Sequence, residues 1–287
     1  MEAYDLKNLH LVTQGGEADI YSIANDKILR VIRNRKGKTF ETEKHLFPIL
    51  AEHHIKVPAV YEYIESEDML AQVMQKVDGS TMLEQMQRNP LKLTQEIKKL
   101  AGMHAKLLEI QSDCGLHSID TIFNYFTSKP SCLDNKLINF ASKILKELPA
   151  KNNICHGDFH PGNILVQDHA YYIIDWSGAY RSDFISDIAH TYLLMAHVPE
   201  VPGQSHLQHA VISFLGSNMA KIYLKEIHKL KEFSLSDFSK WTVVMSLLRV
   251  YYGMPSERAV RINYLKKCCE LNEKNIDTSI WYKYISK

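Results

Sequence analysis

The chain has 287 residues, of which 45% are hydrophobic, enough for a sizeable core in one large domain or two lobes. Its 34 basic and 33 acidic residues give a net charge of +1, with both signs mixed along the chain. This balance lacks the basic surface of a nucleic-acid-binding protein and the polybasic segment of a membrane anchor. No apolar run approaches the roughly 18 residues of a membrane-spanning helix, so we expect neither nucleic acid nor membrane as a partner.

The five cysteines predict reduced thiols rather than a disulfide framework, because their number is odd and their spacing irregular. They form no C-x-x-C pair, so a structural zinc site is not expected either. The first ten residues carry charges where a secretory signal would have its apolar segment. Together these features predict a cytoplasmic protein.

The first 77 residues are predicted to form a small antiparallel sheet with one helix, because short β-prone runs alternate with turn signals. The helix is expected over residues 39–53, where Pro48 should kink or end it. Gly15 and Gly16 lie between the first two strands. They form either a simple hairpin turn or a loop whose backbone can approach a bound triphosphate.

The most informative segment is ICHGDFHPGN, residues 154–163, which is followed by the apolar run YYIIDW. It places Asp158, Asn163 and Asp175 at fixed offsets. An acid that orients or deprotonates a hydroxyl, with an amide and a second acid that hold a metal ion, is the set that Mg-dependent phosphoryl transfer needs. The pattern therefore predicts Asp158 as the catalytic residue and Asn163 and Asp175 as metal ligands.

This segment resembles the H-R-D-L-x-x-x-N and D-F-G motifs of protein kinases. With His-Gly-Asp at residues 156–158, it is similar to the aminoglycoside phosphotransferase-like branch of the protein-kinase-like superfamily, and the resemblance covers about residues 9–265. It implies an α+β, two-lobed protein-kinase-like fold. The implied domains are a nucleotide-binding lobe over residues 1–77, a hinge at about 75–80, and a mainly helical lobe over 78–287 that carries the catalytic loop and the acceptor site.

The resemblance assigns the phosphate contacts to the first lobe. Gly15 and Gly16 take the place of the nucleotide-covering loop, although the full G-x-G-x-x-G is absent. Arg30 takes the place of the phosphate-pairing lysine on its strand. Glu43 is expected to reach Arg30, because its offset on the helix fits better than those of the neighbouring acids.

The resemblance also places the purine of ATP or GTP at the hinge. Met74 would flank the base, and the backbone of Gln75 and Val77 would hydrogen-bond its edge. The nucleotide would be accompanied by Mg²⁺.

Several polar residues of the helical lobe are expected to be structural. His104 falls on an apolar helix face, so it is expected to be a buried core histidine. His156 is expected to hold the catalytic loop by hydrogen bonds. His160 is left open between a phosphate contact and packing. Asp187 could cap a helix; in the resemblance it anchors the catalytic loop from below.

The reaction that the resemblance implies is transfer of the γ-phosphoryl group to a hydroxyl of a small molecule. The segment after Asp175 lacks the A-P-E motif and is too short for the peptide platform of a conventional protein kinase.

An aminoglycoside or related antibiotic is the first candidate acceptor, and choline, amino alcohols and sugars are alternatives. Tyr252 stands where relatives usually carry an acid, which points to a different acceptor. A protein kinase and a catalytically silent nucleotide-binding module are further alternatives, and a monomer or weak dimer is expected.

Overall fold

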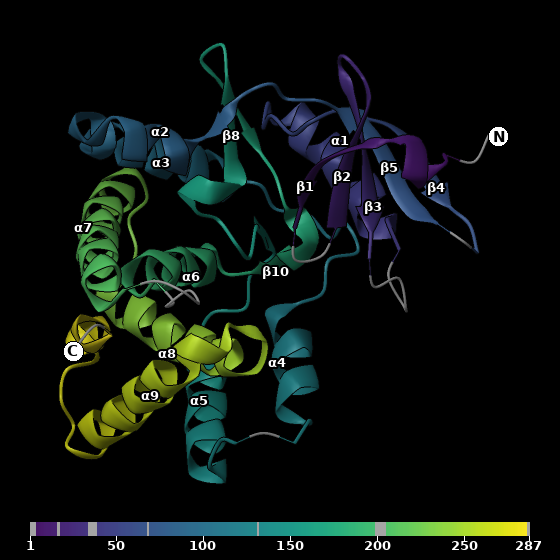
Figure 1. Ribbon diagram of the computed structural model, residues 1–287. Helices are drawn as coiled ribbons and strands as arrows, with labels where there is room; N and C mark the ends of the chain where they lie inside the picture. The colour runs from purple at the N-terminus through teal and green to yellow at the C-terminus, as the bar shows by residue number, and fades with distance from the viewer. Residues whose placement is uncertain are drawn as a thin grey trace. The chain divides into compact units, whose positions relative to one another are not determined.

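The computed structural model describes residues 4–15, 18–33, 39–67, 69–130, 132–198 and 205–285. The chain divides into two compact units, and Figure 1 shows their elements. The first unit comprises Met1–Glu84 and Gly162–Ile174, and the second comprises Gln85–Pro161 and Asp175–Lys287. The mixed α+β character expected from the sequence is confirmed, whereas the expected lobe boundary after residue 77 stays a prediction.

The first unit is built on a five-stranded antiparallel sheet in the order β1-β2-β3-β5-β4. A 3-10 helix (Leu6–Asn8) precedes the strands. These are β1 (His10–Gln14), β2 (Ala18–Ala24), β3 (Lys27–Ile32), β4 (Val60–Glu65) and β5 (Leu70–Gln75), with the helix α1 (Glu41–Glu52) after β3.

Apolar side chains on both faces hold this sheet, because successive residues of a strand point to opposite sides. Leu29 of β3 packs with Ala71 and Val73 of β5 in one core cluster. Ile32 points to the other face and packs with Phe40, at the start of α1, in a second cluster. The second cluster joins β3, which carries Arg30, to the start of α1, which carries Glu43.

The helix expected over residues 39–53 is present as α1, and of the two alternatives for Pro48, a kink or an end, the end does not occur, because α1 continues to Glu52. Proline removes one backbone donor from a helix and costs stability there. Leu46 and Leu50, on either side of it, are completely buried. We infer that their packing holds the helix through the proline.

A smaller three-stranded sheet completes the first unit. It consists of β6 (Ser80–Thr81), β8 (Ile164–Gln167) and β9 (Ala170–Ile173), in the order β6-β8-β9. Asp168 and His169 join β8 to β9 with positive φ angles of 47° and 64°, as a tight hairpin turn requires.

The second unit is mainly helical. After α2 (Met82–Arg88), which spans the unit boundary, come α3 (Leu93–Leu107), α4 (Ile119–Thr127), α5 (Asn135–Glu147), α6 (Phe184–Ala196), α7 (His206–Leu230), α8 (Leu235–Tyr252) and α9 (Arg258–Glu273). A short antiparallel pair, β7 (Asn153–Cys155) and β10 (Tyr180–Ser182), flanks the catalytic segment. Short 3-10 helices lie at Pro90–Lys92, Pro161–Asn163, Trp176–Gly178, Pro255–Glu257 and Thr278–Tyr284.

The centre of the second unit is α8, which is buried on nearly all sides and packs against α5, α6, α9 and the C-terminal 3-10 helix. Its side chains Phe238, Trp241 and Leu248 are at most 1% exposed. Burial on nearly all of its sides makes this helix part of the core. Among the described residues, no helix combines the length and the hydrophobicity needed to cross a bilayer, and all five cysteines are free thiols.

Candidate active site

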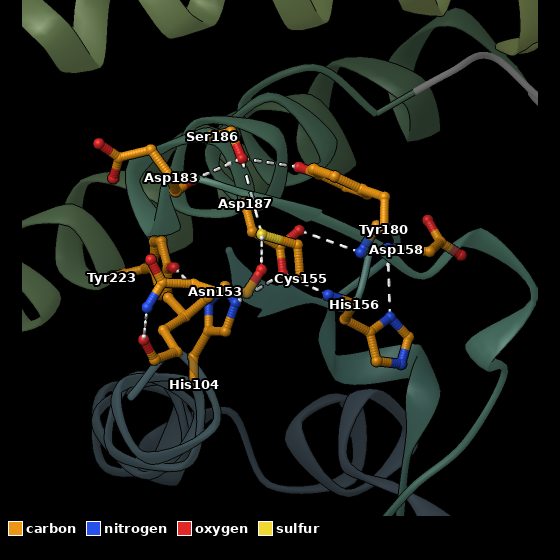
Figure 2. Close-up of polar contacts among 12 residues, drawn as sticks. His104, Asn153, Cys155, His156, Asp158, Tyr180, Asp183, Ser186, Asp187 and Tyr223 are labelled. Carbon is orange, nitrogen blue, oxygen red and sulfur yellow. Dashed lines mark hydrogen bonds and ion pairs between the residues drawn. The ribbon is translucent and has the colours of Figure 1, made fainter. Parts of the chain in front are cut away.

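The loop after β7 is held by one buried carboxylate, that of Asp187 on α6 (Figure 2). Its Oδ2 accepts a hydrogen bond from the His156 N–H at 2.7 Å, and its Oδ1 accepts one from the Gly157 N–H at 3.1 Å. Burial raises the pKa of Asp187, but the hydrogen bond from His104 outweighs it, so the pKa lies below its usual value. The anchoring role expected from the resemblance is confirmed, and the cap of α6 is instead Asp183, whose carboxylate accepts from the Ile185 N–H.

His104 is the core histidine that the sequence predicts. It is completely buried, and its Nε2 lies 3.0 Å from Asp187. Because the carboxylate must accept from Nε2–H, the Nδ1 atom accepts from the Tyr223 hydroxyl at 2.6 Å. The ring also stacks on Phe159, with centroids 4.1 Å apart. The network thus ties α3, α6 and α7 to the catalytic loop.

Gly157 has a conformational requirement that only glycine meets. Its φ is +78°, and a Cβ atom there would clash with the carbonyl group of Gly178. His156 beside it is buried and accepts the Asp158 N–H at its Nδ1, 3.2 Å away. His156 is therefore structural, as expected, and the glycine lets the chain turn so that Asp158 leaves the core.

Asp158 combines partial exposure with a stable negative charge. Its side chain is 38% exposed, and its Oδ2 lies 3.5 Å from Nε2 of His160. Burial raises its pKa, but the hydrogen bond and charge of His160, with the charges of His190 and His156, hold the pKa well below the usual range. The carboxylate is therefore ionised at neutral pH and can accept a proton or a hydrogen bond from a hydroxyl. The His160 contact with phosphate stays a prediction.

Asp175 follows β9 directly and has an unusual backbone conformation, with φ 62° and ψ 67°. A left-handed conformation in a residue other than glycine is strained and is found preferentially at functional sites. Its Oδ1 accepts a hydrogen bond from the Ser177 hydroxyl at 2.8 Å, and the residue is exposed. The carboxylate is thus oriented and open to a ligand.

Asn163 belongs to the first unit, where it precedes β8 and its carbonyl oxygen accepts the Ile174 N–H at 3.0 Å. Carboxylate and amide oxygens are the donors that Mg²⁺ prefers, and this ion usually keeps waters and substrate phosphates as its other ligands. Among the described residues, no group of three or more His, Cys, Asp and Glu side chains could hold a metal alone. Asn163 and Asp175 each offer the type of oxygen donor that Mg²⁺ prefers, and their role as metal ligands stays a prediction.

In the first unit, the ion pair between Arg30 and Glu43 is present at 3.0 Å, and both side chains are largely buried. The sequence reasoning missed a third member, Gln72 of β5, which is completely buried. It accepts from the Arg30 guanidinium at 2.8 Å and donates to Glu43. In the sequence, Gln72 stands out as a polar residue inside the otherwise apolar strand 70–74, and this could have indicated a buried polar partner. The triad fixes the orientation of the Arg30 guanidinium.

The hinge residues differ in what their backbone can offer a ligand. Met74 is buried, and the Gln75 N–H is already bonded to the Ala59 carbonyl oxygen at 2.8 Å. The Val77 carbonyl accepts from Gly79 at 3.0 Å, and among the described residues no partner is found for the Val77 N–H. A purine edge would therefore meet the Val77 N–H and not that of Gln75.

The glycine loop is described only in part, because Gly16 lies outside the described residues. The Gly15 N–H donates to the Ala18 carbonyl oxygen at 2.9 Å, a bond that closes the β1–β2 hairpin. This bond fits the hairpin alternative for Gly15 and engages its amide. A contact of the loop with phosphate stays a prediction.

A buried ionic cluster that sequence reasoning missed lies in the second unit, within the electrostatic reach of Asp158. Glu257 accepts two hydrogen bonds from Arg249, one of them at 2.8 Å, and also bonds Arg261 at 3.1 Å. Arg249 donates to Nε2 of His190 at 3.2 Å. Burial and the charge of Arg249 lower the pKa of His190 to about 4, so its ring is neutral at pH 7. The i, i+4 spacing of Glu257 and Arg261 was the only local signal.

Comparison with known proteins adds a family and a fold. A family model described as a phosphotransferase enzyme family matches residues 9–211. No curated protein sequence matches significantly.

Three solved structures illustrate the similarity of fold. A choline/ethanolamine kinase family protein from Mesorhizobium loti gives a TM-score of 0.62 at 12% identity, covering 97% of this chain and 92% of that chain. An amicoumacin kinase in complex with AMP-PNP, Ca²⁺ and Ami gives 0.62 at 16% identity, covering 94% and 90%. An aminoglycoside-3'-phosphotransferase of type VIII gives 0.55 at 18% identity, covering 82% and 92%. The protein-kinase-like fold expected from the sequence is confirmed.

Proposed function

The chain belongs to the phosphotransferase enzyme family, and from that membership we propose that it transfers the γ-phosphoryl group of ATP or GTP to a hydroxyl of a small molecule. The observation that carries the proposal is the ionised, partly exposed carboxylate of Asp158. It stands on a loop whose backbone is fixed by buried Asp187. Such positioning and charge, rather than covalent work by the protein, are what phosphoryl transfer requires.

In the proposed reaction, the acceptor hydroxyl oxygen attacks the γ-phosphorus. The bond from that phosphorus to the bridging oxygen breaks, and the nucleoside diphosphate leaves. Asp158 orients the hydroxyl and receives its proton. Arg30, held by Glu43 and Gln72, neutralises phosphate charge from the first unit.

The remaining nucleotide contacts are proposals of the same kind. The Val77 N–H would donate to the purine edge, with Met74 beside the base. The Gln75 carbonyl would contact the same edge, and the loop of Gly15 and Gly16 would cover the phosphates. Asn163 and Asp175 would hold Mg²⁺, which supplies positive charge to the phosphates when bound.

A small-molecule acceptor is favoured over a protein. Only eight residues (176–183) separate Asp175 from the start of α6, too few for an extended peptide platform. An aminoglycoside or related antibiotic and a choline-like amino alcohol are both compatible with the folds compared above, whose proteins are described as kinases or phosphotransferases for such compounds.

The test is an ATP- and GTP-consumption assay over a panel of hydroxyl compounds, repeated with Asp158→Asn. We expect the substitution to lower kcat at least about 100-fold, because it removes the proton acceptor. The matched control is Asp168→Asn, which removes the same charge from an exposed turn whose left-handed backbone asparagine tolerates. Turnover that survives Asp158→Asn unchanged overturns the proposal, and nucleotide binding without turnover of any acceptor favours the silent nucleotide-binding module.

A further inference from the structure

A group of partly exposed aromatic side chains in the second unit has no part in the proposed reaction. We call it the aromatic surface: Tyr125 and Phe126 of α4, and Tyr251 and Tyr252 at the end of α8. The Phe126 ring centroid lies 5.3 Å from that of Tyr125, 5.9 Å from Tyr251 and 5.5 Å from Tyr252. Tyr125 is 57% exposed and Tyr252 is 41% exposed. Single exposed aromatic residues are ordinary, but a connected group marks a binding surface.

The aromatic surface lies within the electrostatic influence of Asp158, the reacting carboxylate. The Tyr252 ring meets the His190 ring edge-on with centroids 6.2 Å apart, and the charge of Asp158 acts on His190. Protein atoms packed around its hydroxyl raise the pKa of Tyr252, and the Asp158 charge raises it further. Because all these residues belong to the second unit, their neighbourhood is independent of how the two units are placed. An acceptor whose hydroxyl reaches Asp158 would lay its body toward Tyr252 and Phe126.

The charges around the aromatic surface do not suit a polyamine. Lys129 holds its ammonium 3.7 Å from the Tyr125 ring centroid and 5.9 Å from that of Phe126. The Arg249 guanidinium lies 6.0 Å from the Tyr252 ring centroid. Lys129 therefore already occupies the rings of α4 as a cation, so a cationic ligand would have to compete with it, while Arg249 beside Tyr252 is already paired with Glu257.

The acid that follows α8 cannot compensate for these cations. Glu257 is completely buried and is bonded to both Arg249 and Arg261. Its carboxylate is therefore not available to a ligand amine. Recognition of a polycation needs accessible carboxylates, whereas stacking on rings needs only an apolar or aromatic face.

We propose that the acceptor is an uncharged alcohol with an aromatic or apolar ring, which stacks on the aromatic surface while its hydroxyl meets Asp158. This inference rests on the proposed function for the hydroxyl and on the aromatic surface for the ring. It separates this chain from phosphotransferases that act on polyamines.

The experiment compares phenyl β-glucoside with methyl β-glucoside, two uncharged polyols that differ only in the ring, and with kanamycin as the polycation. Nucleotide-dependent phosphorylation is measured for each, together with binding by saturation-transfer NMR. We expect the phenyl compound to bind or react about 2- to 10-fold better than the methyl compound, the range for one aromatic contact. Tyr252→Ala should reduce the phenyl-to-methyl ratio to about one, and Tyr252→Phe should leave it unchanged.

The control is Leu91→Ala, which shortens an apolar side chain that is 97% exposed and outside the aromatic surface. It should leave the phenyl-to-methyl ratio unchanged. Equal behaviour of the two glucosides, a ratio insensitive to Tyr252→Ala, or preference for kanamycin each overturns the inference. Ring-dependent binding that disappears in Tyr252→Ala, without phosphorylation of any compound, would support the aromatic surface while counting against the proposed phosphotransfer.

Discussion

At the scale of single residues, the charge of Asp158 depends on the imidazole beside it. His160 is the main group that lowers the Asp158 pKa against the effect of burial. Removing the ring in His160→Ala takes away a partner that favours the ionised form, so the pKa of Asp158 rises. The acid limb of kcat/KM should therefore move to higher pH by roughly one unit. A pH–rate profile of the wild-type protein and of His160→Ala measures this change. The control is His53→Ala, which removes an exposed histidine of the first unit. An unchanged acid limb in His160→Ala would contradict the prediction.

Gly157 is a second residue whose role can be isolated. Gly157→Ala puts a Cβ against the Gly178 carbonyl at a positive φ, so we expect a loss of about 2 kcal/mol or more in unfolding free energy and a displaced Asp158. The matched change is Gly102→Ala in α3, where a Cβ meets nothing within 4 Å. It should raise stability by about 0.5–1 kcal/mol, since alanine favours a helix. Urea unfolding measures both, and similar effects of the two substitutions would refute the argument.

At the scale of elements, what can be predicted from the sequence depends on whether the signal is local. The spacing of Asp158 and Asn163 lies within one loop, so it can be seen in the sequence. Gln72 and Glu43 are 29 residues apart, and their contact arises only when β5 and α1 pack together. The continuation of α1 through Pro48 has the same origin, because burial of its neighbours overrides a local propensity.

The cluster that joins α6, α8 and α9 gives an element-scale prediction. Burial raises the pKa of Glu257, but the hydrogen bonds and charge of Arg249 lower it to about 2. Glu257→Gln would leave Arg249 and Arg261 as buried cations without a counter-charge, which costs about 3–5 kcal/mol of unfolding free energy. Glu270→Gln removes an exposed partner of Lys267 on α9 and should cost under about 1 kcal/mol. Chemical denaturation measures the unfolding free energy of both variants. A decrease below 1 kcal/mol in Glu257→Gln would show that the cluster does not stabilise the packing of these helices.

At the scale of the whole molecule, nucleotide and metal binding can be detected as stability without any acceptor. A ligand that binds only the folded state at about 100 times its Kd stabilises it by about 2.7 kcal/mol. For a chain of this length, that corresponds to a Tm rise of roughly 4–5 °C. We expect AMP-PNP with Mg²⁺ to produce such a rise, and EDTA to remove most of it, because phosphate charge is then no longer neutralised.

Asp175→Asn tests which residue holds the metal in that measurement. An amide binds Mg²⁺ more weakly than a carboxylate, so the Mg-dependent part of the Tm rise should fall sharply while the Mg-independent part remains. Asp168→Asn, with the same loss of charge in the exposed β8–β9 turn, should keep the full rise. Calorimetry with and without Mg²⁺ separates the two parts. If Asp175→Asn retains the full metal-dependent rise, the metal is held elsewhere, and the strained left-handed backbone at Asp175 serves some other purpose.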